Sequence, residues 1–161
     1  MISIAAGAQH SVAINTDHKV LLWGANRLCQ LSYSARVKEI YRPVLISGQL
    51  DAISTRQFIA HDKITEDVMF ENLKYIKVEC SSSITVAQIN QFPFLLIWGN
   101  GNQTAWSKPD ILQKQPTMFR CVGIYVYVLT FEGLFYKIDS AKRTYTKIEE
   151  DADDTMDGEV L

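Results

Sequence analysis

The chain has 161 residues, of which 47% are hydrophobic, and it carries 16 basic and 18 acidic side chains. This is enough for one globular domain, and it is too apolar for a chain that is disordered throughout. The sequence holds no run of about 18 apolar residues that predicts a transmembrane helix, and its apolar start lacks the basic region of a secretory signal.

The cysteines indicate the compartment. Cys29, Cys80 and Cys121 are odd in number and lie far apart in the sequence. This pattern does not predict a disulfide framework, and it is typical of a reducing environment. We therefore expect a cytoplasmic or nuclear protein.

The first 25 residues predict a β-hairpin. Residues 11–15 alternate in polarity, with Val12 and Ile14 on one face, as in a half-buried strand. A polar turn at 16–19 separates them from the apolar run 20–23, which ends at Gly24. Two strands joined by so short a turn pair most simply in the antiparallel sense.

A second copy of this pattern follows. Aligning Val12-Ala13 with Val86-Ala87 gives an offset of 74, and aligning Trp23-Gly24 with Trp98-Gly99 gives 75, so one residue is inserted in the intervening loop near residues 91–93. A weaker third copy comprises the strand patterns 126–130 and 134–136. The best helical pattern is short, at residues 65–73. Repeated hairpins of this kind predict an all-β solenoid or propeller.

The first copy also resembles a known family. Its elements, in order, are Ala6-Gly7-Ala8-Gln9-His10-Ser11, then Asp17-His18-Lys19, then Trp23-Gly24-Ala25-Asn26, then Gln30-Leu31 and Arg42-Pro43-Val44. This order and spacing over residues 2–46 are similar to one repeat of the regulator-of-chromosome-condensation family. His18, Cys29 and Ser32 stand where the family has glycine, and the second and third copies are more divergent. The resemblance implies the blades of a β-propeller.

The length limits the number of blades. A four-stranded blade needs ~40–50 residues, so the chain supplies about three, whereas propellers close with ~4–8 blades. We therefore predict a partial β-propeller in residues 1–148, an incomplete ring that is part of a larger propeller or is completed by a partner. Residues 47–72 fit either a long insertion between blades or a degenerate blade.

The charge is unevenly divided. Residues 149–161 contain seven acids and no Lys or Arg, so residues 1–148 hold the other 11 acids and all 16 bases, a net charge of +5. The segment 149–161 is predicted to be a disordered acidic tail. Two interpretations of it stay open: a solubilising end, or an autoinhibitory arm that folds over a basic patch. The scattered bases do not predict nucleic-acid binding.

Candidate chemical groups are few. His10 precedes a Ser, but no acid is placed to orient it, so we predict a buried structural histidine that hydrogen-bonds between strands. The cysteines and histidines lack metal-ligand spacing, and no metal or cofactor is predicted. Trp23 and Trp98, at equivalent positions, are predicted to pack between blades. The residues predicted to contact a partner are Trp106, Lys108, Asn26 and Arg27. For Trp106, which lies in a polar stretch, two interpretations stay open: an exposed anchor, or packing under a loop.

The predicted function follows from the resemblance and from the lack of a catalytic constellation. It is a non-enzymatic protein-interaction and regulatory module on a propeller scaffold. The resemblance implies a protein partner, such as a small GTPase or the remaining propeller blades. Two alternatives are a guanine-nucleotide exchange factor and a small accessory regulator of a transfer-RNA modification complex.

Overall fold

The computed structural model describes residues 2–34, 36–46, 73–90, 95–106 and 116–149. Within these ranges there are twelve β-strands and no helix, and hence no helix that could cross a membrane. The helix predicted at residues 65–73 lies outside them except for Leu73, as do the segment 47–72, Lys108 and the tail from residue 150 onward.

The strands form three four-stranded antiparallel sheets, which we call blades 1, 2 and 3. Blade 1 comprises β1 (Ser3–Ala6), β2 (His10–Ile14), β3 (Val20–Ala25) and β4 (Glu39–Leu45). Blade 2 comprises β5 (Tyr75–Cys80), β6 (Ile84–Ile89), β7 (Leu95–Gly99) and β8 (Asn102–Trp106). Blade 3 comprises β9 (Pro116–Val122), β10 (Tyr125–Thr130), β11 (Phe135–Asp139) and β12 (Thr144–Ile148).

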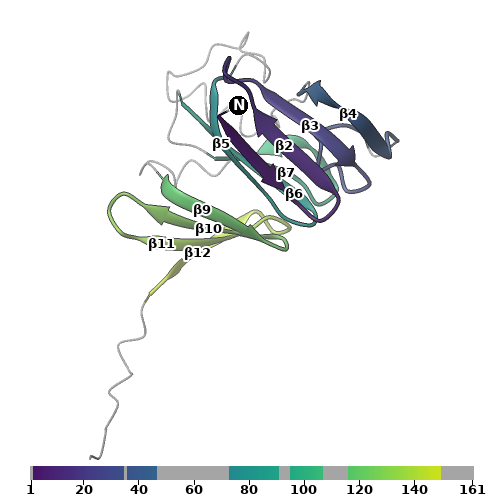
Figure 1. The fold of residues 1–161 in the computed structure, drawn as a ribbon. Coiled ribbons are helices and arrows are strands. Elements are labelled where there is room, and N and C mark those ends of the chain that lie inside the picture. Colours follow the sequence, from purple (N-terminus) through teal and green to yellow (C-terminus); the bar gives the residue numbers. More distant parts are fainter. Residues whose placement is uncertain (1, 35, 47–72, 91–94, 107–115, 150–161) are drawn as a thin grey trace, which may run out of the picture.

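Each blade is a meander, in which strands that follow one another in the chain lie side by side. The first strands of the blades also meet, because β1 and β2 contact β5, and β5 contacts β9 (Figure 1). Successive sheets whose first strands adjoin have the arrangement of propeller blades around an axis. The prediction of an all-β partial propeller of about three blades is confirmed.

Burial distinguishes the middle blade from the outer two. Every residue of β6 and β7 is buried, so blade 2 is covered on both faces. Buried and less buried residues alternate along β10, and every second residue of β1 is exposed. Strands with one covered face alternate in this way, whereas strands covered on both faces read as continuous apolar runs. Blades 1 and 3 each keep one open face.

The register confirms the alignment of the repeats. Ser11 pairs with Trp23 in blade 1, and Thr85 pairs with Trp98 in blade 2. Each partner in β2 or β6 also lies five residues after its partner in the preceding strand, since Ala6 pairs with Ser11 and Cys80 with Thr85. Blade 3 follows the same rule with Cys121, Val126 and Ile138. These three sets of positions are therefore equivalent.

At three positions where the family pattern has glycine, the residue of this chain adopts the backbone conformation that is typical of glycine. His18, Cys29 and Ser32 have φ values of 60°, 58° and 61°, in the left-handed region that glycine adopts most easily. A side chain in this conformation costs roughly 1–2 kcal/mol. The turns of blade 1 thus keep the shape of the repeat although its glycines are lost.

Candidate interaction face

Six turns gather at one end of the blades. In each antiparallel meander, the turn after the first strand and the turn after the third strand lie at the same end. The backbone N–H of Gly101 donates to Leu28 O (2.9 Å) between blades 1 and 2, and the Ser81 hydroxyl donates to Gly123 O between blades 2 and 3. We call this end the loop face; its turns are 7–9, 26–38, 81–83, 100–101, 123–124 and 140–143.

The longest of these turns, which we call the corner loop (residues 26–38), is held by Asn26. The side chain of Asn26 is fully buried, and its Nδ2 lies 2.9–3.1 Å from the backbone oxygens of Tyr33, Ser34 and Val37, which share its two hydrogens. Its Oδ1 accepts the Leu31 backbone N–H at 3.0 Å. The Asn26 side chain thus provides the hydrogen bonds that these backbone groups would make with a neighbouring strand if the strand continued. It thereby fixes where the exposed residues of the corner loop lie.

A buried hydrogen-bond network joins this corner to blade 2. Gln30 O accepts from Trp98 Nε1 at 2.9 Å and from the Thr85 hydroxyl at 2.7 Å. His10 Nε2 lies 2.9 Å from Thr85 Oγ1. Since the single hydroxyl proton of Thr85 is directed at Gln30, His10 is the donor to Thr85 and its neutral ring carries the proton on Nε2. The network fixes the corner loop on blade 2.

The titration of these buried groups fits a structural role. Burial lowers the pKa of His10 from 6.5 to about 4, so its ring is neutral at physiological pH. Its Nδ1 is buried without a hydrogen-bond partner in the described residues. Burial also raises the pKa of Cys80 to about 12 and that of Cys121 well above its usual range. Thiols held protonated in this way are poor nucleophiles.

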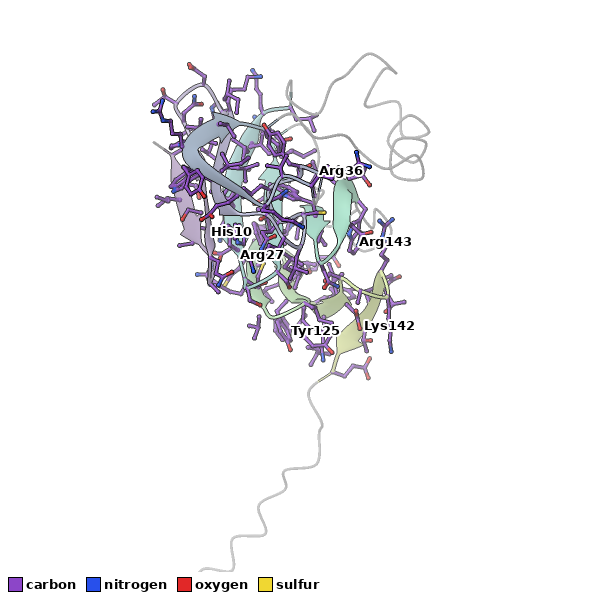
Figure 2. The ribbon with its side chains drawn as sticks, turned by 90° about the vertical axis from the view of Figure 1, so that its right-hand side faces the viewer. His10, Arg27, Arg36, Tyr125, Lys142 and Arg143 are labelled. Carbon is purple, nitrogen blue, oxygen red and sulfur yellow. The ribbon has the colours of Figure 1, made fainter. Side chains whose placement is uncertain are left out.

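The turns of the loop face are rich in basic residues. The described turns contain five of them and no Asp or Glu: Arg27, Arg36, Lys38, Lys142 and Arg143. The first four are exposed, and Figure 2 labels four of the five, on blades 1 and 3. The acids next to these turns are Glu39, exposed at the start of β4, and Asp139, at the base of turn 140–143. At the other end of the blades, the described turns balance Lys19 and Lys74 with Asp17 and Glu132. A basic surface on a rigid scaffold attracts acidic partners.

Arg143 links blade 3 to blade 2 at this face. Its guanidinium carbon lies 5.3 Å from the centre of the Trp106 ring, and its Nη2 is 3.5 Å from Asn102 Oδ1. Asp139 holds the turn that carries Arg143, because its Oδ1 accepts the backbone N–H groups of Ala141 (2.9 Å) and Lys142 (3.0 Å). The turn is thereby fixed at its base.

The predicted contact residues differ in their exposure to solvent. Arg27 is exposed on the loop face, as expected for a contact residue. Trp106 is 2% exposed, so the exposed anchor is wrong and the alternative of packing holds: Trp106 ends strand β8, and its ring lies beneath Arg143. Asn26 is buried and shapes the corner loop from within. Lys108 lies outside the described residues.

The two equivalent tryptophans also differ. Trp98 is fully buried between blades, which confirms the prediction for it, whereas Trp23 is half-buried on the open face of blade 1. Sequence reasoning missed Arg36, Lys142 and Arg143 as members of one face. The signal that was available is their lack of acidic neighbours, but only the fold brings their turns together.

Comparison with known proteins supports the repeat. Residues 1–28 match the family model of the regulator of chromosome condensation (RCC1) repeat. No curated protein matches the chain.

Solved structures support the fold. Prp20p from Saccharomyces cerevisiae is similar with a TM-score of 0.61 and 15% identity, over 84% of this chain and 31% of that one. Human WBSCR16 is similar with a TM-score of 0.65 and 12% identity, over 92% of this chain and 39% of that one. The chain thus spans about a third of the length of these structures. Residues 1–28 are thus similar to a repeat of the regulator of chromosome condensation family, and the described residues form three blades of a β-propeller fold.

Proposed function

We propose that the chain is a protein-interaction and regulatory module that recognises an acidic surface of a protein partner through its loop face. The observation that carries the proposal is the charge of that face, with five basic residues and no acid in its described turns. Residues 1–148 form the repeat domain, and the acidic segment 149–161 is a tail that competes for the same face. The expected location is the cytoplasm or the nucleus.

The support for this proposal is both structural and electrostatic. Loops on a rigid scaffold are frequent recognition sites, and here Asn26 and Asp139 hold the two turns that carry all five basic side chains. Exposed charges of one sign speed the encounter with a partner of opposite sign, and they make binding sensitive to salt.

Charge reversal tests the proposal. The triple variant Arg27→Glu, Arg36→Glu and Lys142→Glu is purified from the native cell beside the wild-type chain, and the recovered proteins are quantified. The matched control is Lys19→Glu, Arg42→Glu and Lys74→Glu, which changes the net charge equally but away from the loop face. We expect the face variant to lose the partners that wild type and control retain. Equal recovery by all three proteins contradicts the proposal.

Deleting residues 149–161 tests the tail. We expect the shortened chain to bind the same partners more tightly, and the gain to disappear in the face variant. Unchanged affinity contradicts a competing tail and leaves the loop face as a separate question.

Regulation of a small GTPase is the second candidate. Its support is that the similar Prp20p is described by its binding to Gsp1p and to histones. Nucleotide release from Gsp1p, followed with a fluorescent nucleotide, tests it: acceleration by the chain favours exchange activity, and binding without acceleration favours an adaptor. The remaining alternative, an accessory role in a transfer-RNA modification complex, predicts recovery of a stable multi-protein assembly instead.

A further inference from the structure

We propose that the acidic partner of the loop face is an extended protein segment that crosses all three blades, with one group of acidic side chains on blade 1 and a second group on blade 3. This proposal rests on the function proposed above, because it specifies the kind of acidic partner that fits the loop face. It differs from recognition of a broad acidic surface, since the two groups of acids are joined by a chain that passes over the turn of blade 2.

The basic residues of the loop face lie only on its outer turns. The turn after the first strand of each blade is the inner one, because the first strands of the blades adjoin. The inner turns, 7–9, 81–83 and 123–124, hold no charged residue. The outer turns hold the blade 1 group, Arg27, Arg36 and Lys38, and the blade 3 group, Lys142 and Arg143. The bases therefore form a narrow row, which fits a single chain better than a broad surface.

Hydrogen bonds place the outer turns side by side in the order of the blades. The backbone N–H of Gly101 donates to Leu28 O at 2.9 Å, which joins the turn of blade 2 to the corner loop. On the other side of this turn, Arg143 Nη2 lies 3.5 Å from Asn102 Oδ1. The outer turn of blade 2 thus lies between the two basic groups.

This middle turn leaves room for a chain to pass. It consists only of Asn100 and Gly101, neither of which is charged. Gly101 is exposed, and a Cβ built on it would meet no atom within 4 Å. An extended backbone can therefore cross the row at Gly101, and it needs no acidic side chain at the crossing.

The uncharged middle also favours a protein segment over a nucleic acid. A nucleic-acid backbone carries one negative charge at every nucleotide, so it would place phosphates over the turn of blade 2 as well as over the two basic groups. A protein segment can hold its acids at two separate points and neutral residues between them.

The distance between blades sets the spacing of the two acidic groups. Packed sheets lie about 10 Å apart, so the outer turns of blades 1 and 3 are separated by roughly 20 Å. Figure 2 shows Arg27 and Lys142 well apart from each other on these two blades. An extended chain covers about 3.3 Å per residue, so about six residues join the acidic groups of the partner.

The two basic groups can accept such a partner. Four of their side chains are exposed and have no ion pair within the described part of the chain: Arg27, Arg36, Lys38 and Lys142. Of the two flanking acids, Asp139 already accepts the backbone N–H groups of Ala141 and Lys142. Glu39 directly follows Lys38, so we expect Arg27 and Arg36 to attract the partner most strongly on blade 1.

Two synthetic peptides of equal composition test the span. In the split peptide, a pair of Glu residues stands at each end of a spacer of about six Gly and Ser residues. In the block peptide, the same Glu residues are adjacent and the Gly and Ser residues flank them. Fluorescence anisotropy at low salt measures the binding of each peptide to the full chain and to the chain without residues 149–161.

Variants separate the two basic groups. Arg27→Gln with Arg36→Gln weakens the blade 1 group, and Lys142→Gln weakens the blade 3 group. The matched control, Lys19→Gln with Lys74→Gln, removes charge at the other end of the blades. We expect wild type and control to bind the split peptide about tenfold more tightly than the block peptide. Each group variant should lose this advantage, whereas the block peptide should respond to one group only.

The outcomes distinguish this proposal from the function on which it rests. Equal affinity for the two peptides, or loss of the advantage in one group variant only, overturns the crossing segment and leaves recognition of an acidic partner standing. Absence of binding by both peptides also overturns the segment, and the charge-reversal recovery described above then decides the function separately.

A cross-link locates the crossing. A photoreactive benzoylphenylalanine at the centre of the spacer is expected to label residues 100–102, which mass spectrometry identifies. Labelling of the inner turn 81–83 instead overturns the proposal. An oligothymidylate of the same span is the competitor: if it binds more tightly than the split peptide and depends on both basic groups, the row belongs to a nucleic acid and the proposal is overturned.

Discussion

The two interfaces between neighbouring blades use different chemistry. Between blades 1 and 2, a buried network runs from His10 through Thr85 to Gln30 O, which also accepts from Trp98. Between blades 2 and 3, apolar residues of blade 3 pack on blade 2, and the polar contacts are separate pairs: the buried Gln88 Nε2 donates to Pro116 O at 3.4 Å, and the Ser81 hydroxyl donates to Gly123 O. In addition, Arg120 forms an ion pair with Glu79, and Lys77 lies 4.9 Å from the centre of the Phe119 ring.

The corner loop accounts for this difference, because it supplies Gln30 O to the first interface. A buried hydrogen-bond network accepts only a neighbour that supplies the matching groups, whereas apolar packing tolerates many neighbours of similar shape. The first interface is therefore the more selective, and the second depends on area. The following predictions test this contrast.

The largest effect is expected at Trp98. Trp98→Ala removes a fully buried indole from the selective interface, and we expect it to lower the free energy of unfolding by about 3–5 kcal/mol. The matched control is Trp23→Ala at the equivalent position, which is half-buried and is expected to cost about 1 kcal/mol. Urea denaturation measures both. Equal losses would show that the two positions contribute alike.

The pH dependence of stability is expected to report on His10. Its pKa is about 4 when folded and 6.5 when unfolded. Between these values the unfolded chain binds a proton that the folded chain does not, so stability falls as the pH decreases through this window, by up to about 3 kcal/mol. Denaturation from pH 7 to pH 4 measures it. The same series on His10→Gln is expected to lack this part of the slope, and parallel slopes contradict the assignment.

Gly99 is expected to show how closely the end of β7 packs against the turn 81–83 of the same blade. Its φ is +101°, and a Cβ there would lie 2.3 Å from Ser83 O. Gly99→Ala therefore combines backbone strain with a collision, and we expect a loss of about 2 kcal/mol or more. Gly101→Ala is the control, because its φ is +86° but no atom lies within 4 Å of a Cβ. About 1 kcal/mol is expected there, and an equal or larger loss would contradict the packing argument.

Much of the fold could be predicted from the sequence because local pattern and register agree. Alternating polarity identified the central hairpins, and the Trp-Gly pairs set their alignment, which the strand pairing confirms. The glycine-like φ values of His18, Cys29 and Ser32 also show why the resemblance persists where its glycines do not. Backbone shape is kept at a small cost in strain.

The candidate site was harder to predict because its properties arise between distant segments. Asn26 was expected to contact a partner, but its amide is used by backbone groups up to eleven residues away. For Trp106, in a polar stretch, the sequence left an exposed anchor and packing under a loop open; the structure buries it at the end of β8, paired with Ile97 of β7 and beneath Arg143. Trp23 and Trp98 have the same local sequence, and only the presence of a preceding blade separates their burial.

The smallest effect is expected at the second interface. The side chain of Arg120 is 58% exposed and that of Glu79 is 22% exposed, so solvent and salt screen their ion pair. Arg120→Ala is expected to cost less than about 1 kcal/mol, and the difference from wild type should shrink further in 1 M salt. A double-mutant cycle with Glu79→Ala isolates the pair from the other contacts of each side chain. A coupling as large as the loss at Trp98 would mean that both interfaces rest on buried polar contacts, and the contrast between them would fail.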